Sequence, residues 1–170
     1  MFFLADDLGW NDVGFHGSPQ IPTPNIDALA RAGIILDQYY VNPVCSPTRA
    51  SLMSGRSMIH TGIQTPYHSG CDASGLNLTY TLLPQHLKAR HNYTSFMVGK
   101  WHLGMKAAAY LPSARGFDRY MGYYTGCEDY WKHYEDLHDG GLARQSFAEH
   151  LIATKALCCT APAWMLIVAQ

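Results

Sequence analysis

A cysteine and an arginine in the stretch NPVCSPTRASLMSG, residues 42–55, are spaced for a shared task. Cys45 and Arg49 are four residues apart, so in a helix their side chains lie on one face, where the guanidinium can bind an anion beside the thiol. The interval between them is too short for a phosphatase-type cysteine loop. A buried, chemically inert cysteine is the alternative interpretation.

Two further pairs of polar residues follow apolar runs. Asp6 and Asp7 end the run MFFLA, and carboxylates are preferred ligands of hard cations such as Ca²⁺. Lys100 and His102 follow the run YTSFMV and alternate along it, so they share a side, where lysine can hold an anionic oxygen and histidine can relay a proton. Taken alone, each pair has a simpler interpretation, as a turn-forming aspartate pair or as a solvated lysine beside a hydrogen-bonded histidine.

The elements that must position these residues alternate between strands and helices. Apolar and β-branched runs predict strands at residues 1–5, 34–41 and 93–98, and capping patterns predict helices at 23–33, 46–55 and 81–92. This alternation predicts an α/β fold with a mostly parallel sheet. Since ligands bind beyond the carboxyl ends of such strands, we expect the polar pairs and Cys45 to converge at one edge.

The helix after Cys45 has clear end signals. Ser46 is the expected N-cap, Pro47 suits the first helical position and Gly55 suits the C-cap. Cys45 should therefore lie just before a helix N-terminus, where free N–H groups and the helix dipole favour an anion. Asn92 is expected to end the helix at 81–92 in the left-handed conformation.

Composition limits the classes of partner and compartment. The 170 residues carry 12 Lys and Arg against 13 Asp and Glu, with no evident basic stripe, so nucleic acid is not an expected partner. The tail APAWMLIVAQ is too short to span a bilayer. Five cysteines without a C-x-x-C pair argue against a structural zinc site.

Two N-x-[ST] sequons, at Asn77 and Asn92, are candidate N-glycosylation sites and favour a secretory route. The first residues, however, reach two aspartates after five apolar positions, with no basic region and no cleavage site. They do not form a signal peptide. We interpret the chain as truncated within a central strand.

Five motifs together resemble the sulfatase family. CSPTR matches its C-x-P-x-R signature and is followed by ASLMSGR, and the other four are LADDLGWNDVGFHG, TPNIDALARAG, MVGKWHLG and LPSARGFDRYMGYYTGCEDYW. The resemblance covers residues 1–131 and is greatest to the arylsulfatase B group, the N-acetylgalactosamine-4-sulfatases. It implies an alkaline-phosphatase-like three-layer αβα fold. Residues 1–141 would form the N-terminal part of the catalytic domain, and 142–170 a partial helix and a divergent tail.

The resemblance also implies a reaction and its residues. A formylglycine-generating enzyme would oxidise Cys45 to Cα-formylglycine, with Pro47 and Arg49 completing its recognition signature. In the hydrated aldehyde, one hydroxyl attacks the sulfur of a sulfate ester, and proton loss from the other releases sulfate. Asp6 and Asp7 would bind one Ca²⁺ ion together with the modified Cys45.

The remaining polar residues have implied roles as well. Arg49 would orient the hydrated aldehyde, Lys100 would bind a sulfate oxygen and His102 would contact the hydrate. The implied substrate is an aryl sulfate or a sulfated glycan, such as a glycosaminoglycan with sulfated N-acetylgalactosamine, and the implied location is lysosomal or secreted.

This chain departs from the family pattern after residue 141. No segment matches the family's second pair of metal ligands, or its second histidine and lysine at the sulfate. An incomplete cation site and a sheet without its later strands lead us to expect no sulfatase activity from the chain as given.

Two other functions stay open. An alkaline-phosphatase-like phosphodiesterase would share the architecture, but it would carry Thr or Ser in place of Cys45. A non-catalytic sulfatase-like module that binds sulfated glycans would explain the missing ligands, but not the intact set of five motifs.

Overall fold

The computed structural model of the protein describes residues 1–66, 74–127, 131, 135–136, 142–143 and 165–169. They belong to two units. The larger unit comprises Met1–Ala5 and Asn42–Gln170, and the smaller unit comprises Asp6–Val41. None of the described helices is long and apolar enough to cross a membrane.

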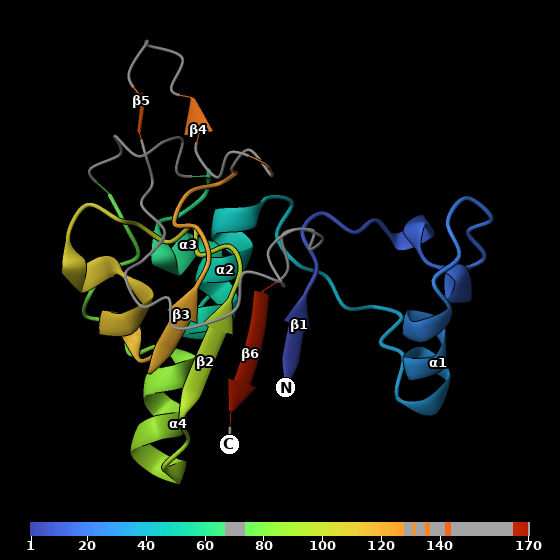
Figure 1. The fold of residues 1–170 in the computed structure, drawn as a ribbon, viewed down its shortest axis with the longest axis horizontal. Helices are drawn as coiled ribbons and strands as arrows, with labels where there is room; N and C mark the ends of the chain where they lie inside the picture. Colours follow the sequence, from blue (N-terminus) through green and yellow to red (C-terminus); the bar gives the residue numbers. More distant parts are fainter. Residues whose placement is uncertain (67–73, 128–130, 132–134, 137–141, 144–164, 170) are drawn as a thin grey trace. The chain divides into compact units, whose positions relative to one another are not determined.

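A four-stranded sheet in the order β1, β6, β2, β3 forms the larger unit's framework (Figure 1). Its strands are β1 Phe2–Leu4, β6 Met165–Ala169, β2 Ser95–Val98 and β3 Arg119–Met121. β2 and β3 are parallel, whereas β6 is antiparallel to both β1 and β2. Three strands therefore run in one direction, as the predicted α/β class requires, and only β6 runs the other way.

The tail to which the sequence assigned no element forms β6. Its residue Leu166 pairs with Phe3 on one side and with Val98 on the other, so β6 joins β1 to β2. The run MLIVA is short, apolar and rich in β-branched residues, which is the signal of a strand within a sheet. The helix predicted at residues 146–159 lies outside the described residues.

Residues 34–41, which were predicted to form a strand, do not form one. Their side chains are strongly exposed, with Ile34 at 90% and Tyr40 at 85%, and no strand of the described chain pairs with them. Residues of this type favour a strand only where a pleated, half-buried surface exists. The burial predicted for β1 is also wrong, because Phe2 and Phe3 are 41% and 56% exposed.

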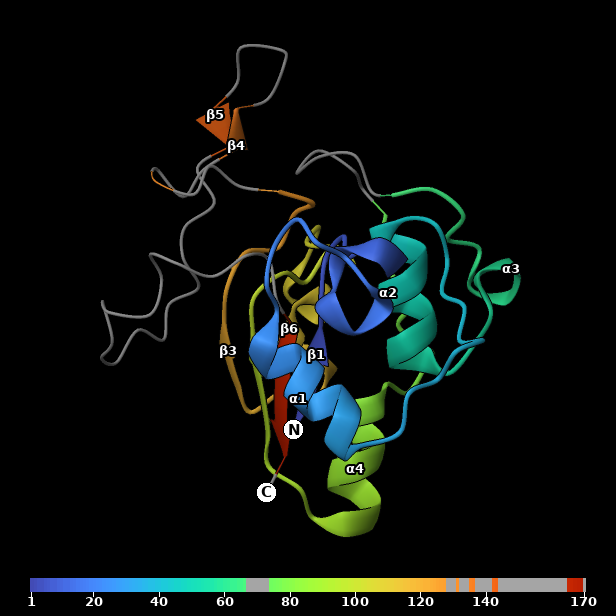
Figure 2. The same ribbon diagram turned by 90° about the vertical axis from the view of Figure 1, so that its right-hand side faces the viewer.

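The helices α2 Cys45–Ser54 and α4 Leu83–His91 lie on one face of the sheet (Figures 1 and 2). Both end as predicted, at Gly55 and Asn92 in the left-handed conformation. The start of α2 lies two residues earlier than predicted, because its N-cap is Val44 rather than Ser46 and Cys45 is already helical.

Short helices complete the larger unit. They are α3 Met58–Thr61, η3 Ala108–Tyr110 and η4 Pro112–Arg115. A separate two-stranded sheet pairs β4 Glu135–Asp136 with β5 Leu142–Ala143.

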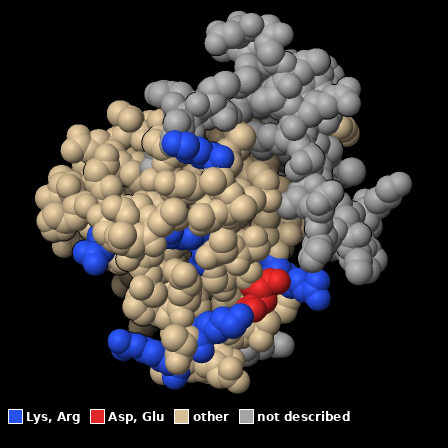
Figure 3. Space-filling view, turned by 90° about the vertical axis from the view of Figure 1, so that its left-hand side faces the viewer, with Lys and Arg blue, Asp and Glu red and all other residues tan. Residues whose placement is uncertain are grey.

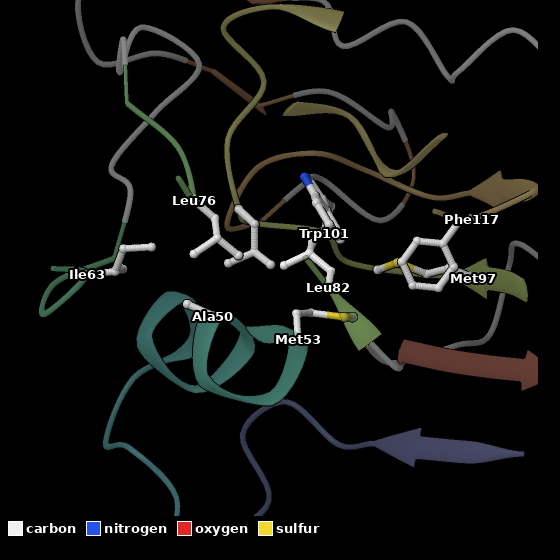
Figure 4. Close-up of a cluster of buried hydrophobic side chains, with 9 residues drawn as sticks. Ala50, Met53, Ile63, Leu76, Leu82, Met97, Trp101 and Phe117 are labelled. Atoms are coloured by element: carbon white, nitrogen blue, oxygen red, sulfur yellow. The ribbon is translucent and has the colours of Figure 1, made fainter. Parts of the chain in front are cut away.

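Nine buried hydrophobic residues form the core between α2 and the sheet (Figure 4). They are Ala50, Met53, Ile63, Leu76, Leu82, Met97, Trp101, Leu103 and Phe117. Trp101 meets Phe117 edge to face, with 6.2 Å between ring centroids. Burying such a ring contributes on the order of 2 kcal/mol. The core therefore fixes the side to which Trp101 turns.

The smaller unit is organised by hydrogen bonds at the start of α1 Pro24–Ala32. The Thr23 hydroxyl accepts the Gly14 N–H at 2.8 Å and donates to Asp27 at 2.7 Å, and Asp27 also accepts the Phe15 N–H at 3.0 Å. These bonds hold α1 against the 3₁₀ turn η2 Gly14–His16, which follows a first such turn, η1 Trp10–Asp12. No residue of α1 is buried, so polar contacts rather than an apolar core define this unit.

Asp118 joins α4 to the beginnings of β2 and β3. Its carboxylate accepts a hydrogen bond from the Lys88 ammonium and another from the Ser95 N–H at 2.9 Å. The Lys88 bond is the main reason why the pKa of Asp118 lies below the ordinary carboxyl value of 3.8. A carboxyl group whose pKa is lowered by folding stabilises the folded state above its unfolded pKa, and this contribution disappears as the pH falls through the folded value.

We therefore expect Asp118→Asn to destabilise the protein at pH 7, by no more than about 1 kcal/mol, because the ion pair is exposed. The difference from wild type should shrink below pH 3.8, as the native carboxylate is protonated. Urea unfolding at a series of pH values measures it, with Asp37→Asn in the smaller unit as the control. A difference that stays constant down to pH 3 would contradict the assigned role.

Candidate active site

Cys45 is the first residue of the ten-residue helix α2. Its thiol is half-buried and forms no disulfide. The N–H groups of the first turn and the helix dipole make this position favourable for negative charge. The predicted placement at an anion-favouring helix end is thus confirmed, although the residue lies inside the helix rather than before it.

The thiol of Cys45 lies 3.0 Å from Nδ1 of His102, a residue 57 positions later in the chain. Only 3% of His102 is exposed. The two groups are within hydrogen-bond distance, so the imidazole can accept a proton from Sγ of Cys45 or donate one to it. A sulfur atom and a nearby base in a largely buried position are the elements of nucleophilic chemistry.

Backbone hydrogen bonds extend the β2–β3 pairing through residues 99–102. The N–H groups of Gly99, Trp101 and His102 donate to the carbonyl oxygens of Met121, Tyr123 and Tyr124 at 2.8, 3.0 and 3.1 Å, respectively. Trp101 turns into the core among the apolar side chains (Figure 4), and Lys100 and His102 on either side of it are also buried, at 3% each. Their predicted shared side stays a prediction, because the φ of +58° at His102 lies outside the extended conformation. Burial raises the pKa of the Tyr124 phenol, so this neighbouring ring stays neutral at physiological pH.

Arg49 connects α2 to the same segment. Its guanidinium is 1% exposed, and Nη1 donates to the carbonyl oxygen of Lys100 at 2.6 Å. A buried charge is tolerated only when it is hydrogen-bonded. Lys100 itself is 3% exposed, so both predicted anion-binding cations are buried in the larger unit with Cys45. The sequence predicted their proximity but not the bond to the backbone.

Ser46 and Gly126 are site residues that the sequence did not reveal. The Ser46 hydroxyl donates to the carbonyl oxygen of His102 at 3.1 Å. A Cβ atom on Gly126 would lie 2.9 Å from Cε1 and 3.0 Å from Nε2 of the His102 ring. His102 has a φ of +58°, a conformation that costs a non-glycine residue roughly 1–3 kcal/mol. The repeated glycines in GYYTGC were the available signal, but their role depends on a contact distant in sequence.

Asp6 and Asp7, the predicted Ca²⁺ ligands, begin the smaller unit. Across the described residues, no group of three or more His, Cys, Asp or Glu side chains could hold a metal ion. Two carboxylates are fewer than the six to eight oxygen ligands that Ca²⁺ takes. The described residues therefore do not complete a calcium site, and the ligand role of this pair stays a prediction.

The two sequons are both accessible. Asn77 and Asn92 are exposed, and the Asn77 side-chain oxygen accepts hydrogen bonds from the N–H and hydroxyl groups of Thr79, each at 2.9 Å. Their surface position is compatible with glycosylation, which stays a prediction.

Comparison with protein families gives a match to the sulfatase family model over residues 1–156. Arylsulfatase J from Mus musculus is 44% identical over 135 residues, which are 79% of this chain and 22% of that protein. N-acetylgalactosamine-6-sulfatase from Homo sapiens is 38% identical over 130 residues, 72% of this chain and 24% of that protein. The chain thus spans about a quarter of the length of the curated relatives it matches.

A solved structure with a similar backbone is that of Ps i-CgsB. The two align with a TM-score of 0.71 and 40% sequence identity, over 75% of this chain and 28% of the other. The two chains are therefore similar in amino-acid sequence as well as in backbone fold.

The close approach of Gly126 to the His102 ring can be tested by substitution. Gly126→Ala should displace the imidazole from Cys45, because the added methyl group would overlap the ring. Overpacking of this kind typically costs about 1–3 kcal/mol. NMR signals of the His102 ring should therefore change in the same direction in Gly126→Ala as in Cys45→Ala.

The control is Gly33→Ala, where the added Cβ would meet only the Leu29 carbonyl oxygen, at 3.2 Å. It should leave the His102 signals unchanged. Unchanged signals in Gly126→Ala would show that Gly126 does not position the ring.

Proposed function

Since the chain belongs to the sulfatase family, we propose that it supplies the nucleophile-bearing part of a site that hydrolyses sulfate esters. Its fold is the alkaline-phosphatase-like α/β fold, as the resemblance implied, with the parallel pair β2–β3 next to the site. The family determines the type of reaction, and the residues of the larger unit support their individual roles.

The observation that carries the proposal is the 3.0 Å contact between Cys45 and His102. Through this contact, Cys45 of the C-x-P-x-R signature lies next to the buried His102 of the GKWHLG motif. An inert core cysteine would not need a histidine in a costly left-handed conformation at its sulfur. This geometry therefore favours a chemical role for Cys45 over a structural one.

In the proposed active protein, a formylglycine-generating enzyme converts Cys45 to Cα-formylglycine. When hydrated, that group would supply one hydroxyl that attacks the ester sulfur and displaces the alcohol, and a second whose proton loss releases sulfate and restores the aldehyde. A plain thiol has no second hydroxyl and hence no such exit. Pro47 and Arg49 are the other residues of the modification signature.

The residues around position 45 then have distinct tasks. His102 lies where it can hold or move a proton at the group on Cβ of residue 45. The first turn of α2 directs N–H groups to the place where negative charge gathers. Arg49 and Lys100 add positive charge in a buried setting, in which electrostatic interactions are stronger than in water.

Asp6 and Asp7 remain the proposed carboxylate ligands of one Ca²⁺ ion, with residue 45 as a further ligand. Carboxylates of this kind suit a hard cation, which would polarise a sulfate oxygen when bound. No step proposed here passes through the ion, because the described residues do not complete its coordination.

The proposed substrate is an aryl sulfate or a glycosaminoglycan that contains sulfated N-acetylgalactosamine. The names of the relatives, arylsulfatase J and N-acetylgalactosamine-6-sulfatase, support this class. The arylsulfatase B group in particular stays a prediction. A lysosomal or secreted location is proposed from the family, with the exposed sequons at Asn77 and Asn92 in support.

The conversion of Cys45 can be tested by expressing the chain with a secretory leader in cells that contain the formylglycine-generating enzyme. An aldehyde-reactive probe should label the wild type and Cys127→Ser, but not Cys45→Ser. Cys127 is a suitable control because it is an exposed cysteine outside the modification signature. Mass spectrometry of the Cys45 peptide locates the aldehyde. A thiol that stays intact would contradict the enzymatic proposal and favour a non-catalytic module.

We further expect the converted 170-residue chain alone to release no sulfate from an aryl sulfate. Two aspartates would hold the cation poorly, since Ca²⁺ takes six to eight ligands. A sulfate-release assay with added Ca²⁺ measures this, and the Cys45→Ser chain provides the background rate. Hydrolysis above that background would show that this chain already contains a sufficient site.

A further inference from the structure

Charge is unevenly distributed along the chain. Residues 42–127 contain eight Lys and Arg against two Asp, whereas residues 6–41 contain one Arg against five Asp. The near-zero net charge of −1 hides this separation. The main part of the larger unit is therefore strongly basic, although the overall composition indicated no basic stripe.

The basic residues of this part fall into two groups by exposure. Arg49, Lys100 and Arg115 are buried, at 1%, 3% and 4%. Arg56, Lys88, Arg90, Lys106 and Arg119 are exposed. Figure 3 shows blue side chains at several places over one face of the molecule, and red atoms only beside blue ones near its lower edge. The exposed group lies outside the core, although Arg56 stacks over the Tyr80 ring, 4.7 Å from its centroid.

Three of the exposed cations, Lys88, Arg90 and Arg119, lie at the end of the larger unit where β2 and β3 begin, and we term them the α4–β3 surface. Lys88 and Arg90 are in the last turn of α4, and Arg119 is the first residue of β3. Asp118 precedes Arg119 in sequence and pairs with Lys88, which connects the helix to the strand. This carboxylate neutralises one of the three cations, so two positive charges remain for an external anion.

The α4–β3 surface and the Cys45 site lie at opposite ends of the strands. Asp118 bonds Ser95, the first residue of β2, whereas His102 follows the end of that strand. A small sulfate ester held at Cys45 would not extend to the beginning of β2. A polymer with many sulfate groups is long enough to contact both places.

From this arrangement we propose that the α4–β3 surface binds a sulfated polysaccharide at a distance from the site of hydrolysis. The inference takes the class of anion from the proposed function. Arg90 and Arg119 present planar guanidinium groups, which match the oxygens of a tetrahedral anion better than a lysine does. Each exposed contact contributes little by itself, but a polyanion makes several contacts at once.

The test compares two doubly substituted chains with the same change in charge. Arg90→Gln/Arg119→Gln removes the unpaired cations of the α4–β3 surface and leaves the Lys88–Asp118 pair intact. Arg56→Gln/Lys106→Gln removes two exposed cations elsewhere in residues 42–127. Binding of fluorescent dextran sulfate is measured by anisotropy at about 0.15 M salt, where distant charges are screened.

We expect the Arg90/Arg119 chain to bind about fivefold more weakly than wild type, as two exposed contacts would give. The Arg56/Lys106 chain should stay within about twofold, and neutral dextran should not bind. Equal weakening in both chains would show a general charge effect and overturn the proposal. So would tighter binding to single-stranded DNA or to phosphatidylserine vesicles than to dextran sulfate.

The same binding measurement separates this inference from the proposed enzymatic function. The binding assay uses the chain produced without the formylglycine-generating enzyme, so its outcome does not depend on the conversion of Cys45. If Cys45 is not converted in cells but binding persists, the α4–β3 surface stands and the enzymatic proposal fails. If Cys45 is converted but dextran sulfate binds no better than neutral dextran, the surface proposal alone fails.

Discussion

The hydrogen bond from the buried guanidinium of Arg49 to the carbonyl oxygen of Lys100 connects the two halves of the site. It ties α2, which carries Cys45, to the segment that carries His102. A buried cation without such a partner would destabilise the fold by several kcal/mol. The charge that makes Arg49 suitable for an anion site thus also makes its position depend on the backbone around Lys100. The Arg49–Lys100 hydrogen bond therefore serves both the packing of α2 and the placement of the positive charge at the site.

That geometry also rests on the segment after β2. Trp101 enters the core against Phe117, and backbone hydrogen bonds to the carbonyl oxygens of Tyr123 and Tyr124 hold the segment to the β3 side. A period of two residues is a local property of extended backbone, and it predicted a shared side for Lys100 and His102. The left-handed φ of +58° at His102 departs from extended backbone, so the orientation of its ring could not be predicted from that period.

Features that depend on partners distant in sequence could not be predicted. Gly55 and Asn92 end their helices as expected, because a left-handed terminal residue is a local requirement. Residues 34–41 have the composition of a strand but no described partner strand, and residues 165–169 find theirs between β1 and β2. In the same way, the motifs identified Cys45 and His102, whereas Gly126 matters only because the folded chain places it against an imidazole ring.

The packing of α2 also has a consequence for the modification of Cys45. The thiol is half-buried, while Pro47 and Arg49 of the same signature are fully buried. An enzyme that recognises Pro47 and Arg49 by direct contact cannot reach them in the folded chain without unfolding the first turns of α2. Opening α2 would break the Arg49–Lys100 bond and leave the arginine's buried charge unpaired. In the proposed conversion of Cys45, recognition of the signature would therefore precede the packing of α2.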